Sequence, residues 1–350
     1  MKFKKNIGIV SYGACLPTQA IAASEIEKTQ GRDIGSVSKS LGVDQKTVPG
    51  IDEDTATLAT DASLQALERL GVKQEIEALF VGSESHPYAV KPTGTIVKEA
   101  LGLSENMSLA DLQFACKAGT QALQICASYI ASGMAKQAVA IGADTAQAAP
   151  GDVLEFTASA GAVSFILGKQ NILAKLIATG SVATDTPDFW RRSGEAYPKH
   201  AGRFTGEPAY FYHVETATKN LLKEIKLEPK DIDHCIFHTP NAKFPQLVAK
   251  KLGFTKEQLA NSLIVKKIGN TYAAAAMLAL AAVLDKAKTG EKILLTSYGS
   301  GAGADSFLFE VAKELEVRRE RWNNLLASQI KKLKLINYQE YREAVDLLSH

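Results

Sequence analysis

Residues 112–134 read LQFACKAGTQALQICASYIASGM, and the rest of the chain is arranged around this stretch. Its apolar and small residues recur at helical spacing, which predicts a helix that begins near Lys117. The residues at that spacing are Ala118, Ala122, Ile125 and Tyr129. Cys116 then stands at the helix start, where unpaired backbone N–H groups and the positive end of the helix dipole favour a thiolate. The stretch therefore indicates a buried helix with a nucleophilic cysteine; the alternative is a core helix whose cysteine is only a small buried side chain.

A second alanine-rich helix is predicted after Gly269, where the sequence reads NTYAAAAMLALAAVLDKA. In each half of the chain, a buried strand and a loop lead to such a helix, then to a strand, and then to a short closing strand, AVSFIL or DSFLFE. This internal repeat predicts a duplicated α/β fold whose two central helices pack side by side, with sites at the carboxyl ends of strands. We place the halves at residues 1–169 and 170–312, followed by a charged, helical tail at residues 313–350.

The composition of the chain bounds its class. The 350 residues are 46% hydrophobic, which allows one large domain or two fused ones, and the formal net charge of +2 is too small for a nucleic-acid surface. The first residues read as a strand rather than a signal peptide, and no apolar run is long enough to cross a membrane. The cysteines lack metal-binding or disulfide-rich spacing, which indicates a reducing compartment. They are Cys15, Cys116, Cys126 and Cys235. We therefore expect a soluble cytoplasmic protein that binds neither nucleic acid nor membrane.

Three ionisable side chains, Glu84, Cys116 and His238, fall just after a buried strand or at a helix start. Acyl transfer through a cysteine needs a thiolate and a proton shuttle, and carbon–carbon bond formation needs a base that takes a proton from carbon. A cysteine, a histidine and a carboxylate together supply these groups. Taken singly, Glu84 also fits a solvated loop acid and His238 a hydrogen-bonded strand-end histidine, while His213 and His234 compete for the role of base.

Asn270 stands at the predicted start of the second alanine-rich helix. Its side chain fits a helix cap, and its amide also fits a group that stabilises an oxyanion or holds a water. The turn SYGSGAGAD, residues 297–305, lacks the spacings that bind nucleotide phosphates, so we expect its glycines to bring backbone N–H groups close to a thioester carbonyl. The candidate phosphate contacts, each of which also fits a solvated surface charge, are Arg191, Arg192, Lys199, Arg203 and Lys243.

A series of short motifs runs through the chain in the order GSESHPY, FACKAGT, IGADTAQ, APGD, TDTPDFWRR, GRFTGEPAYF, PNAKFP, IGNTY and SYGSGAGAD. Together they resemble the 3-hydroxy-3-methylglutaryl-CoA (HMG-CoA) synthases, in particular the compact archaeal type, of the thiolase-like superfamily. The resemblance extends over residues 7–311. It implies the duplicated thiolase-like fold, a five-layered α-β-α-β-α sandwich, in agreement with the repeat in the sequence.

The resemblance also implies a role for each ionisable group. Cys116, in FACKAGT, matches the cysteine that takes an acetyl group from acetyl-CoA. Glu84, in GSESHPY, matches the general acid/base that deprotonates the acetyl methyl. The carbanion attacks the ketone of acetoacetyl-CoA in a Claisen-type condensation, and His238, in FHTPNAKFP, matches the histidine that positions and polarises this ketone. Water then releases HMG-CoA from Cys116, a step of the mevalonate route to isoprenoids.

Further positions match residues that contact the substrate or CoA in this family. They are Thr157, Thr205, Lys243, Asn270 and Ser300, of which Thr157 is the weakest match. No metal or redox cofactor is implied, because the thioester itself acidifies the carbon. The resemblance implies a homodimer or larger assembly, and a complex with acetoacetyl-CoA thiolase and a small zinc-ribbon/OB-fold scaffold protein.

The chain departs from the family pattern near the expected pantetheine path, at Thr239, Ala242 and the alanines that begin with Ala273. Because of these changes, the sequence does not determine which acyl group the site accepts. Two alternatives to an HMG-CoA synthase also stay open. One is a ketoacyl-synthase-III-like acyltransferase on another acceptor, against which the carboxylate of Glu84 argues. The other is a non-catalytic scaffold subunit with the same fold, against which all three ionisable groups argue.

Overall fold

The computed structural model describes residues 1–348 except 3–5, 72–74, 203 and 302. Nine of its strands are hydrogen-bonded in the order β11-β12-β13-β8-β1-β7-β6-β4-β5. These strands are β1 (Gly8–Cys15), β4 (Ala78–Gly82), β5 (Ser108–Leu112), β6 (Ala138–Asp144), β7 (Gly161–Gly168), β8 (Ala174–Ala183), β11 (His234–Phe237), β12 (Lys292–Thr296) and β13 (Gly303–Val311). The short predicted strand at residues 78–82 has the same bounds in the structure.

The strand order repeats itself on the two sides of the β1–β8 contact. On one side the order is β1-β7-β6-β4, and on the other it is β8-β13-β12-β11. In both halves the outer pair is parallel, β4 with β6 and β11 with β12, and the next pair is antiparallel, β6 with β7 and β12 with β13. Among the described residues, two pairs join β1 to β8, Gly8 with Lys175 and Ile9 with Ala174. The topology is therefore that of one α/β unit used twice.

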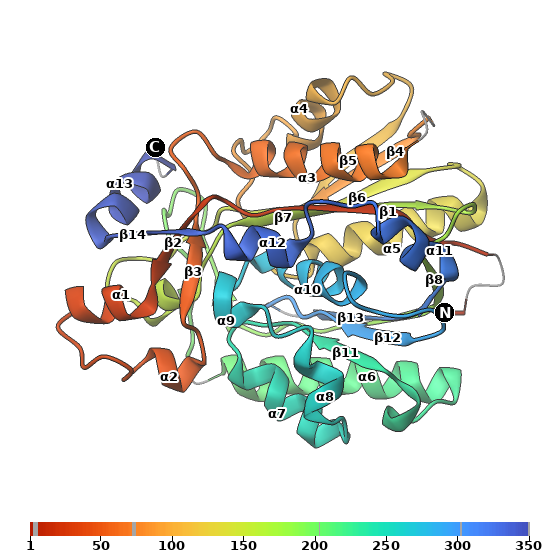
Figure 1. Cartoon of the computed structure of the whole chain (residues 1–350). Helices are drawn as coiled ribbons and strands as arrows, with labels where there is room; N and C mark the ends of the chain where they lie inside the picture. The colour runs from red at the N-terminus through yellow and green to blue at the C-terminus, as the bar shows by residue number, and fades with distance from the viewer. Residues whose placement is uncertain (3–5, 72–74, 203, 302, 349–350) are drawn as a thin grey trace.

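Helices cover both outer faces of the sheet and fill the space between its halves (Figure 1). In Figure 1, α3 and α4 lie above the β1–β7–β6 half, and α6, α7 and α8 lie below the half that holds β11, β12 and β13, with α5 and α10 between. Their bounds are α3 (Thr55–Leu70), α4 (Thr93–Ala100), α5 (Ala118–Ser132), α6 (Phe211–Ile225), α7 (Lys243–Leu252), α8 (Lys256–Ala260) and α10 (Ala275–Leu284). The expected five-layered α-β-α-β-α sandwich is confirmed.

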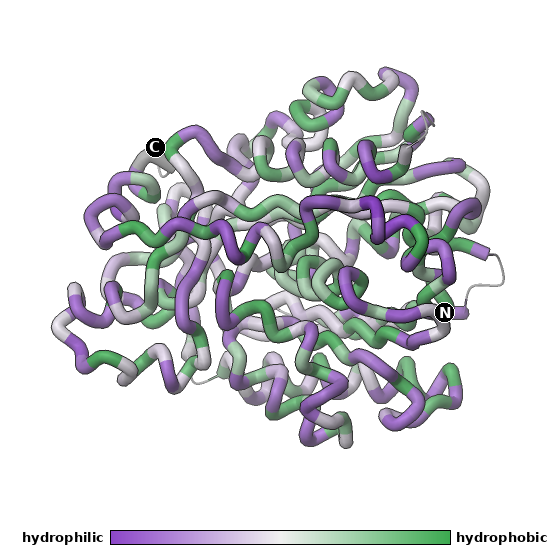
Figure 2. Tube along the Cα trace, in the orientation of Figure 1, coloured by the Kyte–Doolittle hydropathy of each residue, from purple (hydrophilic) through white to green (hydrophobic). Residues whose placement is uncertain are grey.

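The two central helices contain small residues because they are enclosed on all sides. Every residue of α10 is buried, and Figure 2 shows this helix as largely hydrophobic, whereas α6, α7 and α8 alternate between hydrophilic and hydrophobic residues. A Cβ on Gly119 of α5 would lie 2.4 Å from the carbonyl oxygen of Ala273 and 2.8 Å from the sulfur of Met277. Only glycine allows this approach, so the predicted packing of the two alanine-rich segments against each other is confirmed.

The sequence pattern indicated a helical C-terminal tail, but in the structure the tail is only partly helical. It contains α11 (Lys313–Arg319), α12 (Leu326–Lys331), β14 (Lys334–Ile336) and α13 (Tyr338–Leu348). β14 pairs in parallel with β2 (Gln19–Ala22), which pairs with β3 (Gln45–Val48). This strand was missed because it is short, mainly exposed, and paired with a strand about three hundred positions earlier in the chain.

The remaining elements are short and lie mainly in long connections. They are α1 (Ala23–Thr29), α2 (Ser38–Leu41), α9 (Val265–Ile268), β9 (Phe189–Trp190), β10 (Lys199–His200), and the single turns Val153–Phe156, Thr205–Tyr210, Pro229–Asp231 and Tyr272–Ala274. Within the described ranges, no helix has the length and apolar character needed to cross a bilayer. In this part of the chain, no three His, Cys, Asp or Glu side chains are grouped as metal ligands would be.

Candidate active site

One cavity of ≈ 260 Å³ brings together most of the residues that the sequence singled out. The predicted residues that line it are Cys116, Thr157, Thr205, His238, Asn270 and Ser300. They come from both halves of the chain, since Cys116 precedes α5 and His238 follows β11. Tyr210, Tyr272 and Tyr298 also line the cavity, which is mainly apolar. A small apolar pocket with a few converging polar groups is typical of a site for a small substrate.

Cys116 is 5% exposed and stands on a tight turn just before α5. The turn is closed by backbone hydrogen bonds from Lys117 to Phe114 (3.2 Å) and from Ala118 to Ala115 (3.0 Å). Ala115 has a φ of +42°, which is uncommon for a residue other than glycine and is often found where a structure orients a functional group. The helix predicted to begin near Lys117 is thus confirmed, with Cys116 next to its first turn.

Glu84 approaches Cys116 from the end of β4. A Cβ on Gly82 would lie 2.1 Å from the carbonyl carbon of Ala118, so β4 passes very close to the start of α5. The Glu84 carboxyl lies close enough to the Cys116 thiol for each group to shift the pKa of the other. Its Oε1 atom is buried and has no hydrogen-bond partner among the described residues. A free carboxylate oxygen beside a buried thiol is suited to accept a further proton.

Glu84 does not line the cavity of Cys116 but a neighbouring one of ≈ 860 Å³. Phe189 and Tyr272 line both cavities and lie at the boundary between them. Arg191, one of the candidate phosphate contacts, also lines the larger cavity, and its Nη2 donates to the backbone oxygen of Glu84 at 3.1 Å. The carboxylate therefore reaches the sulfur across the boundary between two cavities.

The expectation that Cys116 rests as a thiolate is wrong. Burial, followed by the interaction with Glu84 and the charge of Asp144, raises the pKa of the Cys116 thiol well above its ordinary value. These effects outweigh the helix start, so the thiol keeps its proton at neutral pH. Burial and then Asp144 also raise the pKa of Glu84, to about 8. A carboxyl with this pKa is a much stronger base than an ordinary glutamate and is matched to proton transfer near neutral pH.

Asp144, which the sequence analysis did not single out, holds the Glu84 loop in place. It ends β6 and is fully buried. Its Oδ1 accepts from the hydroxyls of Ser83 (2.8 Å) and Ser85 (2.6 Å) and from the backbone N–H groups of Glu84 (2.8 Å) and Ser85 (3.0 Å). Its Oδ2 accepts from the backbone of Ala273 at 2.7 Å. The available signal was its position at the end of a predicted strand in IGADTAQ.

His238 is held by its backbone while its ring faces aromatic side chains. Its N–H donates to the oxygen of Thr296 at 3.0 Å, and its backbone oxygen accepts from the hydroxyl of Tyr210 at 2.7 Å. The ring centroid lies 6.5 Å from that of Tyr210 and 6.4 Å from that of Tyr298. Burial lowers the pKa of His238 to about 3, so the imidazole is neutral at physiological pH. A neutral imidazole can donate one hydrogen bond to a carbonyl without carrying charge into the pocket.

The two competing histidines have other partners. His213 is bonded to the backbone oxygen of Ala209 and to the hydroxyl of Thr184, and His234 is paired with Glu291 at 2.9 Å. Neither residue lines the cavity of Cys116.

Asn270 is not a helix cap, because α10 begins only at Ala275, after a single 3₁₀ turn. Its backbone N–H donates to the oxygen of Thr157 at 2.7 Å, and its Oδ1 accepts from the N–H of Tyr272 at 3.0 Å. The backbone bridge between Ala158 and Asn270 therefore joins the two halves along one wall of the cavity. The expectation of a cap failed because the alanine run hides the point at which the chain becomes helical.

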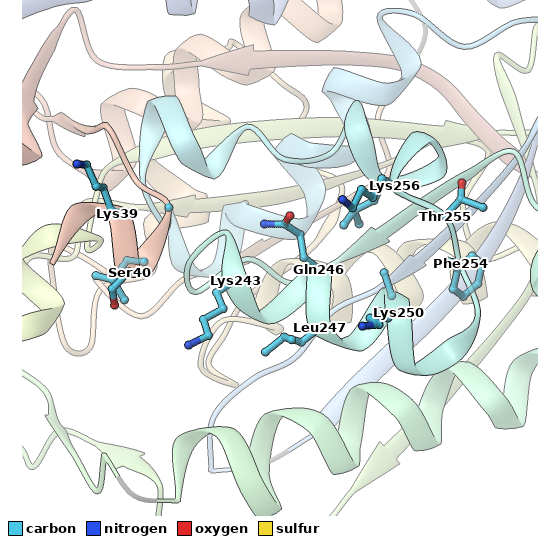
Figure 3. A pocket seen from close by; sticks show the side chains of 13 residues that line it. Lys39, Ser40, Lys243, Gln246, Leu247, Lys250, Phe254, Thr255 and Lys256 are labelled. Carbon is cyan, nitrogen blue, oxygen red and sulfur yellow. The ribbon is translucent and has the colours of Figure 1, made fainter. Parts of the chain in front are cut away.

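Lys243 lies apart from the other predicted residues, in a third cavity of ≈ 660 Å³ that Figure 3 shows from close by. Side chains from α2, α7 and the start of α8 line this cavity, and Leu41 lines both it and the cavity of Cys116. Its cationic side chains are Lys39, Lys243, Lys250 and Lys256. Four lysines together with apolar lining side chains suit a ligand that has both phosphate and apolar parts.

Three of the other predicted phosphate contacts, Arg191, Arg192 and Lys199, line neither the cavity of Lys243 nor that of Cys116. Lys199 is paired with Glu195, whose carboxylate also accepts from the backbone of Arg192 at 3.2 Å. Arg203 lies outside the described residues.

Comparisons with known proteins identify relatives over the whole chain. The family model of the hydroxymethylglutaryl-coenzyme A synthase N terminus matches residues 3–172, and that of the 3-oxoacyl-[acyl-carrier-protein] synthase III C terminus matches residues 222–311. The hydroxymethylglutaryl-CoA synthase of Methanopyrus kandleri is 48% identical over 96% of both chains. That of Archaeoglobus fulgidus is 53% identical over 89% of this chain and 90% of its own. The solved structure of MvaS in complex with 3-hydroxy-3-methylglutaryl coenzyme A is 25% identical and covers 97% of this chain and 92% of its own, with a TM-score of 0.89.

The duplicated sandwich and a buried cysteine beside a carboxylate and a histidine define an acyl-transferring condensing enzyme with the thiolase-like fold. The identity with curated archaeal enzymes over nearly the whole length narrows this class further. The chain belongs to the hydroxymethylglutaryl-CoA synthase family.

Proposed function

We propose that this chain condenses acetyl-CoA with acetoacetyl-CoA and water to give HMG-CoA and CoA, through an acetyl group carried on Cys116. The observation that supports this most strongly is that the Glu84 carboxyl lies beside the Cys116 thiol, which shares its cavity with His238. Neither a ketoacyl-synthase-like acyltransferase on another acceptor nor a non-catalytic scaffold accounts for relatives that are named HMG-CoA synthases at about half identity.

The first step is acetyl transfer. The Cys116 sulfur attacks the thioester carbon of acetyl-CoA, the bond from that carbon to the CoA sulfur breaks, and the thiol proton leaves with CoA. Because the pKa of the thiol is raised, this proton must be accepted as the sulfur attacks. Glu84 is the carboxylate beside the sulfur, and its pKa of about 8 suits this transfer. The turn that carries Ser300 borders the cavity where negative charge develops on the carbonyl oxygen.

The second step forms the carbon–carbon bond. Glu84 takes a proton from the methyl of acetyl-Cys116, and the carbanion attacks the ketone of acetoacetyl-CoA. The neutral imidazole of His238 donates a hydrogen bond to that ketone, and the alkoxide takes up the proton that Glu84 holds. Water then adds to the thioester carbon and releases HMG-CoA from Cys116. These steps require no metal or redox group, because the thioester acidifies the methyl.

The cavity of Cys116 and the lysine-lined cavity, which share Leu41 in their linings, suit the two parts of CoA. The pantetheine thioester would occupy the mainly apolar cavity of Cys116, beside Thr157, Thr205 and Asn270. The phosphates would lie at the lysine-lined cavity, which includes Lys243. This arrangement accounts for Lys243 lying apart from the residues around the sulfur.

The wider setting follows from the family and the fold. We propose cytoplasmic action by a homodimer or larger assembly, and β5 at the edge of the nine-stranded sheet offers unpaired backbone groups to a second copy. A complex with acetoacetyl-CoA thiolase and a small zinc-ribbon/OB-fold protein stays a prediction from the family resemblance. The division at residues 169 and 170 is supported by the repeated strand order.

The direct test is an assay of the purified chain with acetyl-CoA and acetoacetyl-CoA, in which HMG-CoA is identified by mass spectrometry. We expect HMG-CoA to form with the wild-type chain and not with Cys116→Ala. Acetyl-CoA consumption without HMG-CoA would instead support an acyltransferase on another acceptor. No reaction from a correctly folded chain, with or without co-expressed thiolase, would support the scaffold.

A further inference from the structure

An ion pair is buried directly behind the reactive cysteine. Lys117 is 2% exposed, and its Nζ lies 3.0 Å from Oδ2 of Asp305 and 2.8 Å from Oε1 of Gln121. Asp305 is fully buried on β13, and its Oδ1 accepts from the hydroxyl of Ser181 at 2.7 Å. Burying two charges costs so much solvation that such a pair is weak evidence for a stabilising role. The role of the pair is therefore better judged from the groups that it holds in place.

The lysine side chain lies against the glycine-rich turn that carries Ser300. Gly299 and Gly303 exchange backbone hydrogen bonds of 2.8 and 2.9 Å, which close the base of that turn. A Cβ on Gly299 would lie 2.8 Å from Cγ of Lys117 and 2.5 Å from the backbone oxygen of Phe114. A Cβ on Gly303 would lie 3.1 Å from Cε of Lys117. The turn therefore rests directly on the lysine and on the residues that precede Cys116.

The same aspartate connects α5 to both sides of the turn. The hydroxyl of Thr120 donates to Oδ2 of Asp305 at 3.0 Å and lies 2.7 Å from that of Ser297. The backbone N–H of Asp305 donates to the hydroxyl of Ser297 at 3.3 Å. Ser297 is the first residue of the segment SYGSGAGAD that forms the turn, and Asp305 is the last. These contacts join the helix behind Cys116, in the N-terminal half, to a turn that belongs to the C-terminal half.

We propose that Lys117 and Asp305 are positioning residues that hold the glycine-rich turn in register with the Cys116 sulfur for acyl transfer. This inference rests on the proposed function. Attack by the sulfur on the thioester forms the sulfur–carbon bond, breaks the bond from carbon to the CoA sulfur, and places transient negative charge on the carbonyl oxygen beside the turn. A displacement of the turn by a fraction of an ångström weakens the stabilisation of that oxygen, since such interactions depend steeply on geometry.

The test compares acyl transfer with a reaction of the same sulfur that develops no oxyanion. The variants are Lys117→Met, Asp305→Asn and the double variant, with Lys219→Met as a control for loss of an exposed lysine. For each, the rate of Cys116 acetylation by acetyl-CoA, the rate of Cys116 alkylation by iodoacetamide and the melting temperature are measured. Asp305→Asn is the mildest change, because its amide oxygen still accepts from Ser181 or Thr120.

We expect each single variant to acetylate about 10- to 100-fold more slowly at saturating acetyl-CoA, with KM nearly unchanged and alkylation within about twofold of wild type. Replacing both charges by neutral groups of similar size should restore much of the melting temperature, since buried pairs are often no more stable than such replacements. Acetylation by the double variant should nevertheless stay slow.

Three results would overturn the inference. The first is an acetylation rate in Asp305→Asn equal to that of the wild type. The second is recovery of the acetylation rate together with the melting temperature in the double variant. The third is an equal loss of acetylation and alkylation rates in the single variants. A wild-type chain that acetyl-CoA does not acetylate would count against the proposed function, not against this comparison. If Lys117→Met does not fold, Asp305→Asn and the double variant decide the matter.

Discussion

The Glu84 carboxyl lies close enough to the Cys116 thiol to raise its pKa, although the two residues line different cavities. The contact places the carboxylate beside the atom that would carry the acetyl group, and therefore beside its methyl. In the proposed mechanism the substrate occupies the cavity of Cys116 and His238, while Glu84 lines the neighbouring, more polar cavity. The base therefore does not occupy the space that the second substrate needs.

Glu84→Gln should separate the two chemical steps. The amide cannot take a proton from carbon, so we expect condensation to fall about 10²- to 10⁴-fold, the usual contribution of a general base. Acetylation of Cys116 should continue, with a smaller loss, because the thiol can lose its proton to water. Both rates are measured by quenched-flow mass spectrometry. Glu99→Gln, a change of an exposed carboxylate, is the matched control. Equal losses in both steps would mean that Glu84 is not the base that deprotonates the acetyl methyl.

The pH dependence of condensation should follow Glu84. Only the ionised carboxylate accepts the methyl proton, and the pKa is raised to about 8, so the rate should increase with pH and level off above about 8. Glu84→Gln should lack this rise in its residual rate. A wild-type profile that is already flat from pH 5 would mean that a different group, or an ordinary glutamate, controls the step.

The same raised pKa predicts a change in stability. A carboxyl whose pKa is higher in the folded state binds its proton more tightly there, so its contribution to stability is lost as pH rises from its ordinary value of 4.5 to about 8. Glu84→Gln removes a buried charge and should raise the melting temperature most above pH 8, and little near pH 4.5. Thermal melts at several pH values check this. A stabilising effect that is the same at every pH would contradict it.

Asp144 should set the pKa of Glu84 as well as the position of its loop. Its charge is the second cause of the raised pKa, so Asp144→Asn should shift the rising limb of the pH–rate profile to lower pH. In this variant the amide NH₂ group also points at a backbone N–H donor, either that of Glu84 or that of Ala273. The lost hydrogen bond should lower the free energy of unfolding by about 1–3 kcal/mol. Ser128→Ala, at a helix hydroxyl, is a control for stability. An unshifted limb would show that burial alone tunes Glu84.

Lys243 should act on CoA binding and not on the chemistry. If the phosphates of CoA lie in the lysine-lined cavity, Lys243→Ala should raise KM for acetyl-CoA about tenfold and leave kcat nearly unchanged, as expected for one charge-assisted contact. The change should have little effect with acetyl-pantetheine, which lacks the phosphates. Lys219→Ala is the matched control. Equal effects on both thioesters would place the phosphates elsewhere.

Local patterns in the sequence predicted much of the fold. The bounds of β4 were found because five buried apolar residues stand between turn signals, and α3 because Asp54 caps it and Gly71 ends it. The small residues of α5 and α10 indicated enclosed helices. In contrast, β14 was missed because its pairing with β2 depends on residues far away in the chain.

The electrostatics of the site could not be predicted from the sequence. The thiolate expected for Cys116 came from its place before a helix, but the structure adds burial and the carboxyl groups of Glu84 and Asp144. Asp144 itself could not be told apart from other acidic residues that follow strands. The separation of Lys243 from Ser300 likewise depends on how α7 and the glycine-rich turn are placed in space.

Mass spectrometry of the Cys116 peptide, after the chain is mixed with acetyl-CoA alone, tests most directly whether Cys116 carries the acetyl group. We expect an acetyl group on Cys116 and none on Cys126 or Cys235. When acetoacetyl-CoA is added, the acetyl group on Cys116 should disappear as HMG-CoA forms. An unmodified Cys116 in a folded chain that still forms HMG-CoA, or an acetyl group that acetoacetyl-CoA does not remove, would contradict this expectation.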